Sequence, residues 1–144
     1  MEKDQSYYRL FDHTADLGME IFGDSAAQVF INAAKSIFEV ITGSKLGNLD
    51  SKHQLRIDVD GEDWADLMVN WLRELLYLCN GKQQIVHQLE IEFISEHNLR
   101  AVVTADDFDP AKHKIDKEIK AVTYHQIAVL HDVNGWRAKV IFDV

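Results

Sequence analysis

The residue types best suited to chemistry lie at the two ends of this sequence. Residues 12–18 read Asp-His-Thr-Ala-Asp-Leu-Gly, which places two carboxylates and an imidazole just before an apolar run. The chain ends on Asp143 and Val144, which add a side-chain carboxylate and the terminal carboxylate. Carboxylate oxygens are the ligands that calcium and magnesium prefer. If the fold joins the two ends, Asp12, Asp16, Asp143 and the Val144 carboxylate could supply an all-oxygen metal site.

Each of these residues also has a purely structural interpretation. Aspartates in loops commonly hydrogen-bond nearby backbone and stabilise turns, and the residues taken alone favour that interpretation over a metal site. His13 is a candidate metal ligand or general base, and His125, close to the C-terminal strand, is a second candidate. A lone histidine is more often a structural residue than a functional one.

Two further groups of residues are assigned structural roles. Asp106, Asp107 and Asp109 resemble the start of a calcium loop, but they lack its alternating acids, its glycine and its distal glutamate. We therefore expect them to lie in a solvated, charged loop over residues 106–118. Cys79 falls on the apolar stripe of a helix and is expected in the core.

The composition limits the class of protein. The chain has 144 residues, which suits one domain over residues 1–144. It carries 24 Asp and Glu against 15 Lys and Arg, a net charge of −9. Proteins that bind nucleic acid directly gain much of their affinity from Lys and Arg on phosphates. We therefore expect no direct high-affinity binding of nucleic acid, and a cation or a basic protein surface is the more natural partner.

The sequence also carries indications of its compartment. Its single cysteine excludes an internal disulfide and fits a reducing compartment. The first residues lack the apolar core of a signal peptide, and no apolar run approaches the ~20 residues that span a bilayer. We expect a cytoplasmic protein without a membrane partner.

Two amphipathic helices and several strands account for most of the chain. Apolar residues recur at helical spacing over residues 29–41 and 64–79. Asp24 or Ser25 is expected to cap the first helix, and Gly43 to end it. Strands are expected over residues 7–11, 17–22, 55–59, 83–94, 99–105, 119–130 and 136–142. This order predicts an α+β fold in which two amphipathic helices pack on a mainly antiparallel β-sheet.

The dipeptide Asn134-Gly135 predicts a two-residue hairpin turn near the C-terminus. Such a turn fixes the pairing of the last two strands, so that Val133 faces Trp136, Asp132 faces Arg137, Val129 faces Val140, Ile127 faces Phe142, Gln126 faces Asp143 and His125 faces Val144. The register therefore predicts that the C-terminus is the end of a paired strand and that its carboxylate has a defined position.

Two motifs taken together resemble the archease family. They are residues 12–18 and residues 118–125, which read Glu-Ile-Lys-Ala-Val-Thr-Tyr-His, followed by Gly135-Trp136 and a terminal Ile-Phe-Asp-Val. The likeness covers the whole chain, including a helix after Gly-Asp-Ser, a tryptophan-bearing second helix and the length. The two motifs together are far more specific than either alone.

The resemblance implies a non-enzymatic accessory protein of an RtcB-type RNA ligase, a class that joins RNA ends in tRNA splicing and RNA repair. Archeases help the ligase become guanylylated and complete many turnovers. The family binds a divalent metal, typically calcium, with magnesium as an alternative. Carried over to this chain, the ligands are Asp16, Asp143 and Val144, the last through its terminal carboxylate.

The family motifs also contain residues without an implied metal role. His13, Glu118 and Lys120 are candidates for contact with the ligase, and for Lys120 the alternative is a solvated strand face. Asp12 is left as a turn residue or a support for the ligands, and His125 is a candidate for a similar supporting role.

Two other classes of function remain open on the sequence alone. One is a metal-dependent phosphoester hydrolase that uses His13 as a base beside the aspartates. The other is a general chaperone or scaffold, which would need no metal and would tolerate changes at Asp143.

Overall fold

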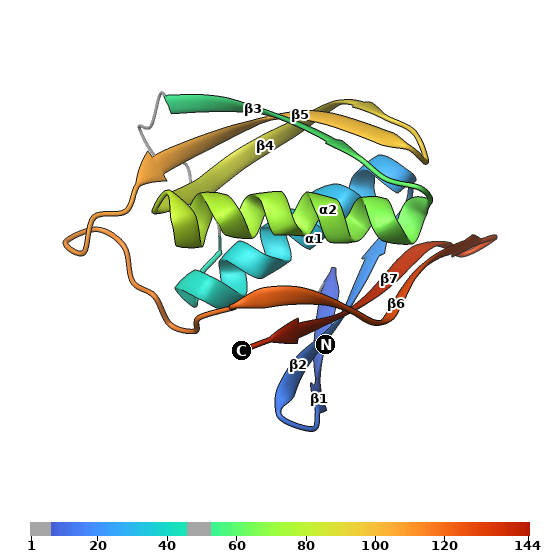
Figure 1. The fold of residues 1–144 in the computed structure, drawn as a ribbon, viewed down its shortest axis with the longest axis horizontal. Coiled ribbons are helices and arrows are strands. Elements are labelled where there is room, and N and C mark those ends of the chain that lie inside the picture. The colour runs from blue at the N-terminus through green and yellow to red at the C-terminus, as the bar shows by residue number, and fades with distance from the viewer. Residues whose placement is uncertain (1–6, 46–52) are drawn as a thin grey trace, which may run out of the picture.

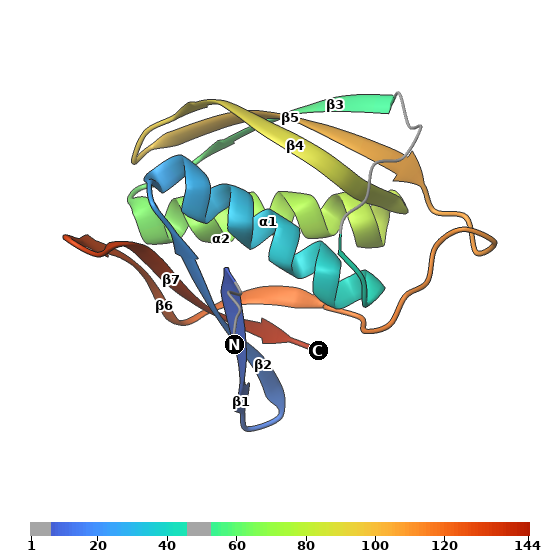
Figure 2. The same cartoon turned by 180° about the vertical axis from the view of Figure 1, so that it is seen from behind.

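The fold consists of two antiparallel sheets with two helices between them. The structure is a computed structural model that describes residues 7–45 and 53–144. In chain order the elements are β1 (Tyr8–His13), β2 (Asp16–Gly23), α1 (Ala26–Thr42), β3 (His53–Asp60), α2 (Trp64–Leu76), a short π-helical turn η1 (Tyr77–Gly81), β4 (Gln84–Ile94), β5 (Asn98–Asp107), β6 (Ala121–Asp132) and β7 (Gly135–Asp143). Figure 1 shows one sheet above the helices and the other below them, and Figure 2 shows the same layers from behind.

The strands form two separate sheets. One sheet has the order β1-β2-β7-β6, the other has the order β3-β5-β4, and all neighbouring strands are antiparallel. The α+β class and the antiparallel pairing are thus confirmed, whereas the expected single sheet is replaced by two. A helix that is apolar around most of its circumference has to be covered on more than one side. The wide buried faces of α1 and α2 explain why each helix contacts strands of both sheets.

Local signals set the ends of α1 where the sequence predicts them. The hydroxyl of Ser25 accepts a hydrogen bond from the N–H of Gln28 at 3.1 Å, which identifies Ser25 as the N-cap. Gly43 follows the last helical residue with a left-handed φ of 73°, and its N–H donates to the carbonyl of Glu39. Glycine adopts this conformation without steric strain, which explains the stop.

The second helix begins as expected but ends differently. The side chain of Asp63 accepts the N–H of Asp66 and caps the first turn. The α-helix stops at Leu76, and residues 77–81 continue as a π-helical turn instead of a fourth regular turn. Cys79 lies in this turn and is only half-buried, so the prediction that it is a core residue is wrong in part.

A tryptophan connects the two helices within the core. Trp71 of α2 is fully buried, and its indole N–H donates to the carbonyl of Phe30 in α1 at 2.9 Å. This hydrogen bond holds the two helices in one register where they touch, and it satisfies the only polar atom of the tryptophan side chain.

Within the described residues, no helix combines the length and the apolar character needed to cross a membrane.

The predicted register of the last hairpin is wrong by two residues. The structure pairs Asp132 with Gly135, so Val133 and Asn134 form the turn and Asp132 does not face Arg137. The side chain of Asp132 accepts the N–H of Asn134 at 2.8 Å, and this Asx-type bond selects the earlier turn. Val133 therefore does not face Trp136; His131 does.

A bulge in β6 changes the register further toward the C-terminus. Val129 pairs with Ala138 instead of Val140, and the pairing shifts between Thr123 and Ala128. The positive φ of 54° at Gln126 lies within this bulge. Val122 then pairs with Phe142 and Ala121 with Asp143, so Ile127, Gln126 and His125 do not occupy the positions predicted opposite Phe142, Asp143 and Val144. Asp143 is nevertheless paired at the end of β7, as expected.

Candidate functional site

The N-terminal motif folds into a tight hairpin. The strands predicted over residues 7–11 and 17–22 extend further, as β1 and β2, and pair antiparallel so that His13 lies opposite Asp16 across a two-residue turn. The Nδ1 atom of His13 lies 3.9 Å from the Oδ2 atom of Asp16. The hairpin thus places this imidazole and this carboxylate side by side at its tip.

The tip contains a strained residue. Thr14 has a φ of 53°, in the left-handed region that β-branched side chains rarely adopt. Strain of this kind amounts to about 1–3 kcal/mol per residue and is typical of functional sites. We expect Thr14→Asn to raise the free energy of unfolding by about 1 kcal/mol, because asparagine tolerates this conformation. Urea unfolding of metal-free protein would measure the gain.

The neighbouring turn residue provides the control for this prediction. Ala15 has no positive φ, so Ala15→Asn should bring no gain in stability. Equal unfolding free energies for Thr14→Asn and the wild type would contradict the inference of strain.

The last strand brings the C-terminus to the same hairpin. β7 runs between β2 and β6, and Leu17 of β2 pairs with Phe142. Continuing this ladder by one position sets Asp16 beside Asp143, where opposed Cβ atoms are about 4.5–5.5 Å apart. Leu17 and Phe142 are buried, so Asp16 and Asp143 project from the opposite face of the sheet.

The bulge in β6 adds a histidine to this face. The rings of His125 and His13 contact edge to face, with centroids 5.1 Å apart. The next residue toward the N-terminus, Tyr124, instead donates its hydroxyl to Asp66 of α2 at 2.8 Å. At this bulge Tyr124 therefore contacts α2, whereas His125 contacts the hairpin of β1 and β2. We call His13, Asp16, His125, Asp143 and Val144 the terminal cluster.

Asp12 lies outside this cluster. It pairs with Leu17 in the β1–β2 ladder and is exposed. Because side chains alternate along a strand, Asp12 projects from the face opposite to that of its neighbour His13. The two aspartates of the motif therefore point to different sides of the hairpin.

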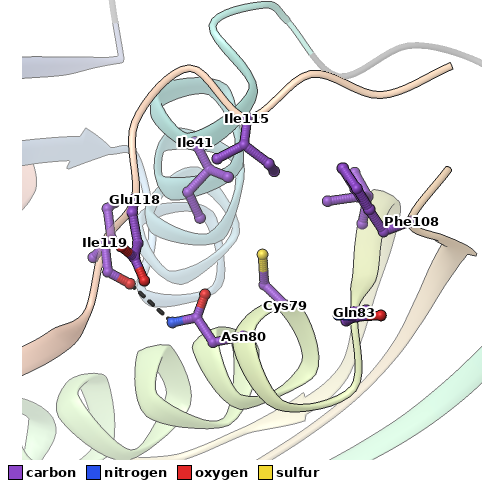
Figure 3. Close-up of a pocket in the computed structure, with 9 residues that line it drawn as sticks. Ile41, Cys79, Asn80, Gln83, Phe108, Ile115, Glu118 and Ile119 are labelled. Carbon is purple, nitrogen blue, oxygen red and sulfur yellow. Dashed lines mark hydrogen bonds between the residues drawn. The ribbon is translucent and has the colours of Figure 1, made fainter. Parts of the chain in front are cut away.

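The remaining motif residues, Lys120 and Glu118, line two different pockets. The backbone N–H of Lys120 donates to the carbonyl of Asp143 at 2.8 Å, which ties the segment before β6 to the C-terminus. The side chain of Lys120 lines an open groove with Arg73 and Tyr77. Glu118 lines a different cavity of about 290 Å³ at the end of α1 (Figure 3), and no residue of the terminal cluster lines that cavity.

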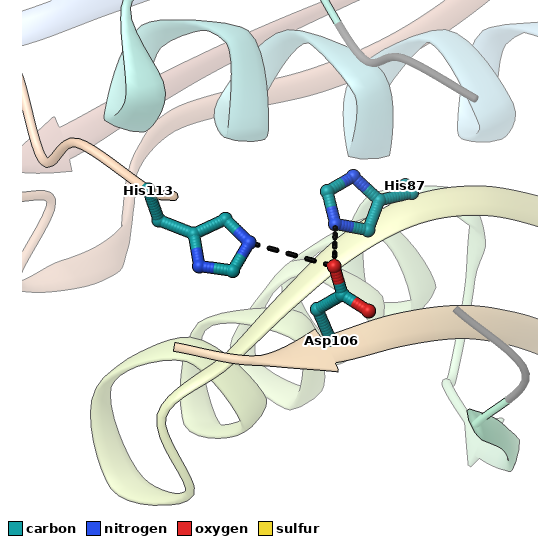
Figure 4. Close-up of side chains that lie close together, drawn as sticks. All are labelled: His87, Asp106 and His113. Carbon is teal, nitrogen blue, oxygen red and sulfur yellow. Dashed lines mark hydrogen bonds and ion pairs between the residues drawn. The ribbon is translucent and has the colours of Figure 1, made fainter. Parts of the chain in front are cut away.

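A second polar cluster was missed by the sequence reasoning. His87 of β4, Asp106 of β5 and His113 of the following loop lie together (Figure 4), although no sequence motif joins them. The prediction that Asp106 lies in a solvated loop is wrong, because β5 extends to Asp107 and only 20% of the Asp106 side chain is exposed. The only signal in the sequence was the alternation of residues along the strand ending at Ala105, which could have been continued to Asp106.

The titration of His87 gives this cluster a pH-dependent effect on stability. Burial lowers the pKa of His87 below its ordinary value, although nearby Asp106 partly offsets the shift. The unfolded chain therefore takes up a proton at this residue near pH 6.5, before the folded protein does. We expect this contribution to stability to be complete above about pH 6.5 and to fall as the pH drops below it.

Thermal unfolding of the wild type and His87→Gln between neutral and mildly acidic pH would measure this effect. The variant should show a flatter loss of unfolding temperature toward acid. His97→Gln is the control, because 67% of the His97 side chain is exposed. The same pH slope in His87→Gln and the wild type would contradict the assignment.

Comparisons with known proteins agree with the fold and with the family that the sequence resembles. A sequence profile of the Archease protein family (MTH1598/TM1083) matches residues 8–144. The chain is 32% identical to the protein archease of Methanosarcina acetivorans, with 95% of each chain covered. It is 30% identical to the protein archease of Pyrococcus furiosus, with 93% of this chain and 96% of that protein covered.

Two solved structures have a similar fold. The solution structure of protein 1598 of Methanobacterium thermoautotrophicum matches with a TM-score of 0.77 and 27% identity, covering 97% of this chain and all of that one. The crystal structure of an archease, described as a possible chaperone, from Thermotoga maritima matches with a TM-score of 0.62 and 22% identity, covering all of this chain and 98% of that one. The second match concerns the fold alone.

Proposed function

Because the chain belongs to the archease family, we propose that it is a non-catalytic accessory protein that activates an RtcB-type RNA ligase in the cytoplasm. In this proposal the protein promotes guanylylation of the ligase and its multiple turnover in tRNA splicing or RNA repair. The terminal cluster is the site that acts, and it holds a divalent cation, calcium or magnesium.

The single observation that supports this proposal is the meeting of the two ends of the chain. The pairing of Leu17 with Phe142, continued by one position, would set Asp16 opposite Asp143, and the terminal carboxylate follows Asp143 directly. A set of carboxylate oxygens fits a hard cation such as calcium better than zinc or copper. Asp16, Asp143 and the Val144 carboxylate would hold the ion, whose double positive charge would offset most of their three negative charges.

The net charge of the chain also agrees with a role in which the ligase, and not this protein, binds the RNA. A protein with a net charge of −9 is poorly suited to holding RNA phosphates by itself. The ligase would bind the RNA, and this protein would act through contact with the ligase. In this proposal His13 and Lys120 contact the ligase, and the hydrogen bond from the Lys120 N–H to the Asp143 carbonyl keeps the Lys120 backbone next to the C-terminus.

An assay of ligase turnover tests the proposal. Purified protein is added to an RtcB-type ligase of the same source, with calcium or with a chelator, and the guanylylated ligase and joined RNA are measured. The proposal predicts stimulation that depends on the divalent ion. Absence of stimulation by the wild type, or equal stimulation by the wild type and Asp16→Asn, would contradict it.

The same experiment separates the alternatives. A metal-dependent hydrolase with His13 as base would cleave a phosphoester without any ligase. A general chaperone would raise the yield of folded ligase equally with calcium and with chelator. Either result would replace the proposed mechanism.

A further inference from the structure

The second polar cluster combines two imidazoles with a carboxylate, whereas the proposed calcium ligands are carboxylates alone. The Nε2 atom of His87 and the Oδ2 atom of Asp106 are 3.1 Å apart, and the Nε2 atom of His113 is 3.5 Å from the same oxygen. The three donor atoms lie within 4.8 Å of one another. They come from β4, β5 and the loop over residues 108–120, and their side chains point toward one another (Figure 4).

One nitrogen in this cluster has no hydrogen-bond partner among the described residues. The side chain of His113 is 5% exposed, and its buried Nε2 atom makes no hydrogen bond although it points at Asp106. A buried polar atom without a partner destabilises the folded protein. The unused atom lies where a shared ligand would contact all three side chains.

The chemistry of the three donors selects the kind of ligand. Two imidazole nitrogens and one carboxylate oxygen suit zinc and related transition metals, whereas calcium prefers oxygen alone. Donors that share such a metal at about 2.1 Å lie no more than about 4.2 Å apart. Both contacts to Asp106 meet this limit. All three donor atoms lie within 4.8 Å of one another, so at most a small approach of the two rings completes the set.

We propose that His87, Asp106 and His113 form a second metal site, which takes a divalent transition-metal ion of the zinc class. The site is independent of the proposed calcium site, because it shares no residue with the terminal cluster. Three protein ligands leave a fourth position for water.

Metal binding at this site must move a proton. The N–H of Asp109 donates to the Nδ1 atom of His113 at 2.8 Å. In the metal-free protein the neutral ring therefore carries its proton on Nε2. When the metal takes the Nε2 lone pair, that proton moves to Nδ1 and the Asp109 N–H has to turn away. The backbone amide of Asp109 is thus a specific reporter of occupancy.

Binding would also link the two sheets more firmly. The loop that carries His113 leads from β5 in one sheet to β6 in the other (Figure 1). A metal shared by His113 and the β4 and β5 residues would attach the middle of this loop to one sheet. Its far end, at Lys120, is already bonded to Asp143 of the other sheet.

A calorimetric titration of chelator-treated full-length protein with zinc tests the proposal. We expect one equivalent of zinc to bind with the wild type. Loss of a supporting contact alone weakens metal sites by about 10–100-fold, so loss of a ligand should weaken this one by about 100-fold or more. Cobalt should give the absorption bands of a nitrogen-ligated ion, and the Asp109 amide resonance should shift on zinc binding.

The variants are chosen to keep the fold. His113→Asn retains an oxygen near the Nδ1 position that can accept the Asp109 N–H, and His87→Gln can still donate to Asp106, yet both remove a metal nitrogen. His97→Gln, at an exposed position, and Asp16→Asn should bind zinc as the wild type does. Circular dichroism confirms that each variant is folded.

Several results would overturn the proposal. One is wild-type protein that takes up no zinc. Another is equal zinc affinity in folded His113→Asn and the wild type. A third is zinc binding that leaves the Asp109 amide unchanged. In each of these cases the three residues are only a polar network centred on Asp106, and not a metal site. Failure of the ligase assay would not affect this proposal, because the two sites are measured with different metals.

Discussion

Asparagine at Asp16 or Asp143 is expected to weaken calcium binding by about 100-fold or more, because even the loss of a supporting contact weakens metal sites by about 10–100-fold. Each substitution removes a charged ligand and keeps the shape of the side chain. Calorimetric titration with calcium would measure the affinity. The same variants should no longer stimulate the ligase, so binding and activation should be lost together.

Stability without metal should move in the opposite direction. Asp16, Asp143 and the terminal carboxylate bring like charges onto one face of adjacent strands, and like charges placed opposite each other destabilise a sheet. Asp16→Asn should therefore unfold at the same or a higher temperature than the wild type in chelator. Calcium should then raise the unfolding temperature of the wild type but not that of the variant.

Asp12 offers a matched control within the same motif. It is also an aspartate of the hairpin, but strand alternation places it on the opposite face. Asp12→Asn should bind calcium as the wild type does. Equal loss of affinity in Asp12→Asn and Asp16→Asn would mean that general negative charge, and not the terminal cluster, attracts the ion.

The chain end provides a test of Val144 alone. A short extension beyond Val144 moves the terminal carboxylate away from Asp143 without changing any side chain. We expect this extension to weaken calcium binding, whereas an extension of the same length before Met1 should not. Unchanged affinity with the C-terminal extension would remove Val144 from the proposed ligands.

Signals that act within a few residues predicted the helices well. The Ser25 cap and the Gly43 stop depend on local hydrogen bonds and on the conformational freedom of glycine, both of which can be identified in the sequence. The division of the strands into two sheets could not be predicted in the same way. Alternation along a strand indicates which side chains are buried, but it does not indicate which strand lies alongside.

The last hairpin shows a competition between two local signals. Asn134-Gly135 favoured one turn, but the side chain of Asp132 accepts a hydrogen bond from the N–H of Asn134 and stabilises the turn that starts one residue earlier, at Val133. The bulge that brings His125 to His13 depends in addition on Tyr124 reaching Asp66 of α2. That contact is set by tertiary packing, so the sequence pattern did not contain it.

The two candidate sites differ in how far the sequence could reveal them. The residues of the terminal cluster were singled out by their types and by the resemblance to a family, and the ladder positions of Asp16 and Asp143 supply a physical route for their meeting. His87, Asp106 and His113 belong to three segments without a common motif. Only the pairing of β4 with β5, and the return of the loop over them, places these side chains together.

Replacing Trp71 with alanine is expected to lower the free energy of unfolding by about 3–5 kcal/mol, the range for removing a buried aromatic side chain. The side chain is fully buried between the helices, and the substitution also removes its hydrogen bond to Phe30. Domains of this size have a total stability of about 5–15 kcal/mol, so this single change removes a large part of it. Urea unfolding followed by circular dichroism would measure the loss.

Trp64 provides the matched control for this prediction. It lies on the same helix but is only partly buried, and it contacts Trp136 edge to face with ring centroids 5.0 Å apart. Trp64→Ala should therefore lower the free energy of unfolding by less than Trp71→Ala. Trp71→Phe should fall between the wild type and Trp71→Ala, because it keeps an aromatic ring and loses the bond to Phe30. Equal losses for Trp64→Ala and Trp71→Ala would mean that the deeper burial of Trp71 and its hydrogen bond to Phe30 add nothing to stability.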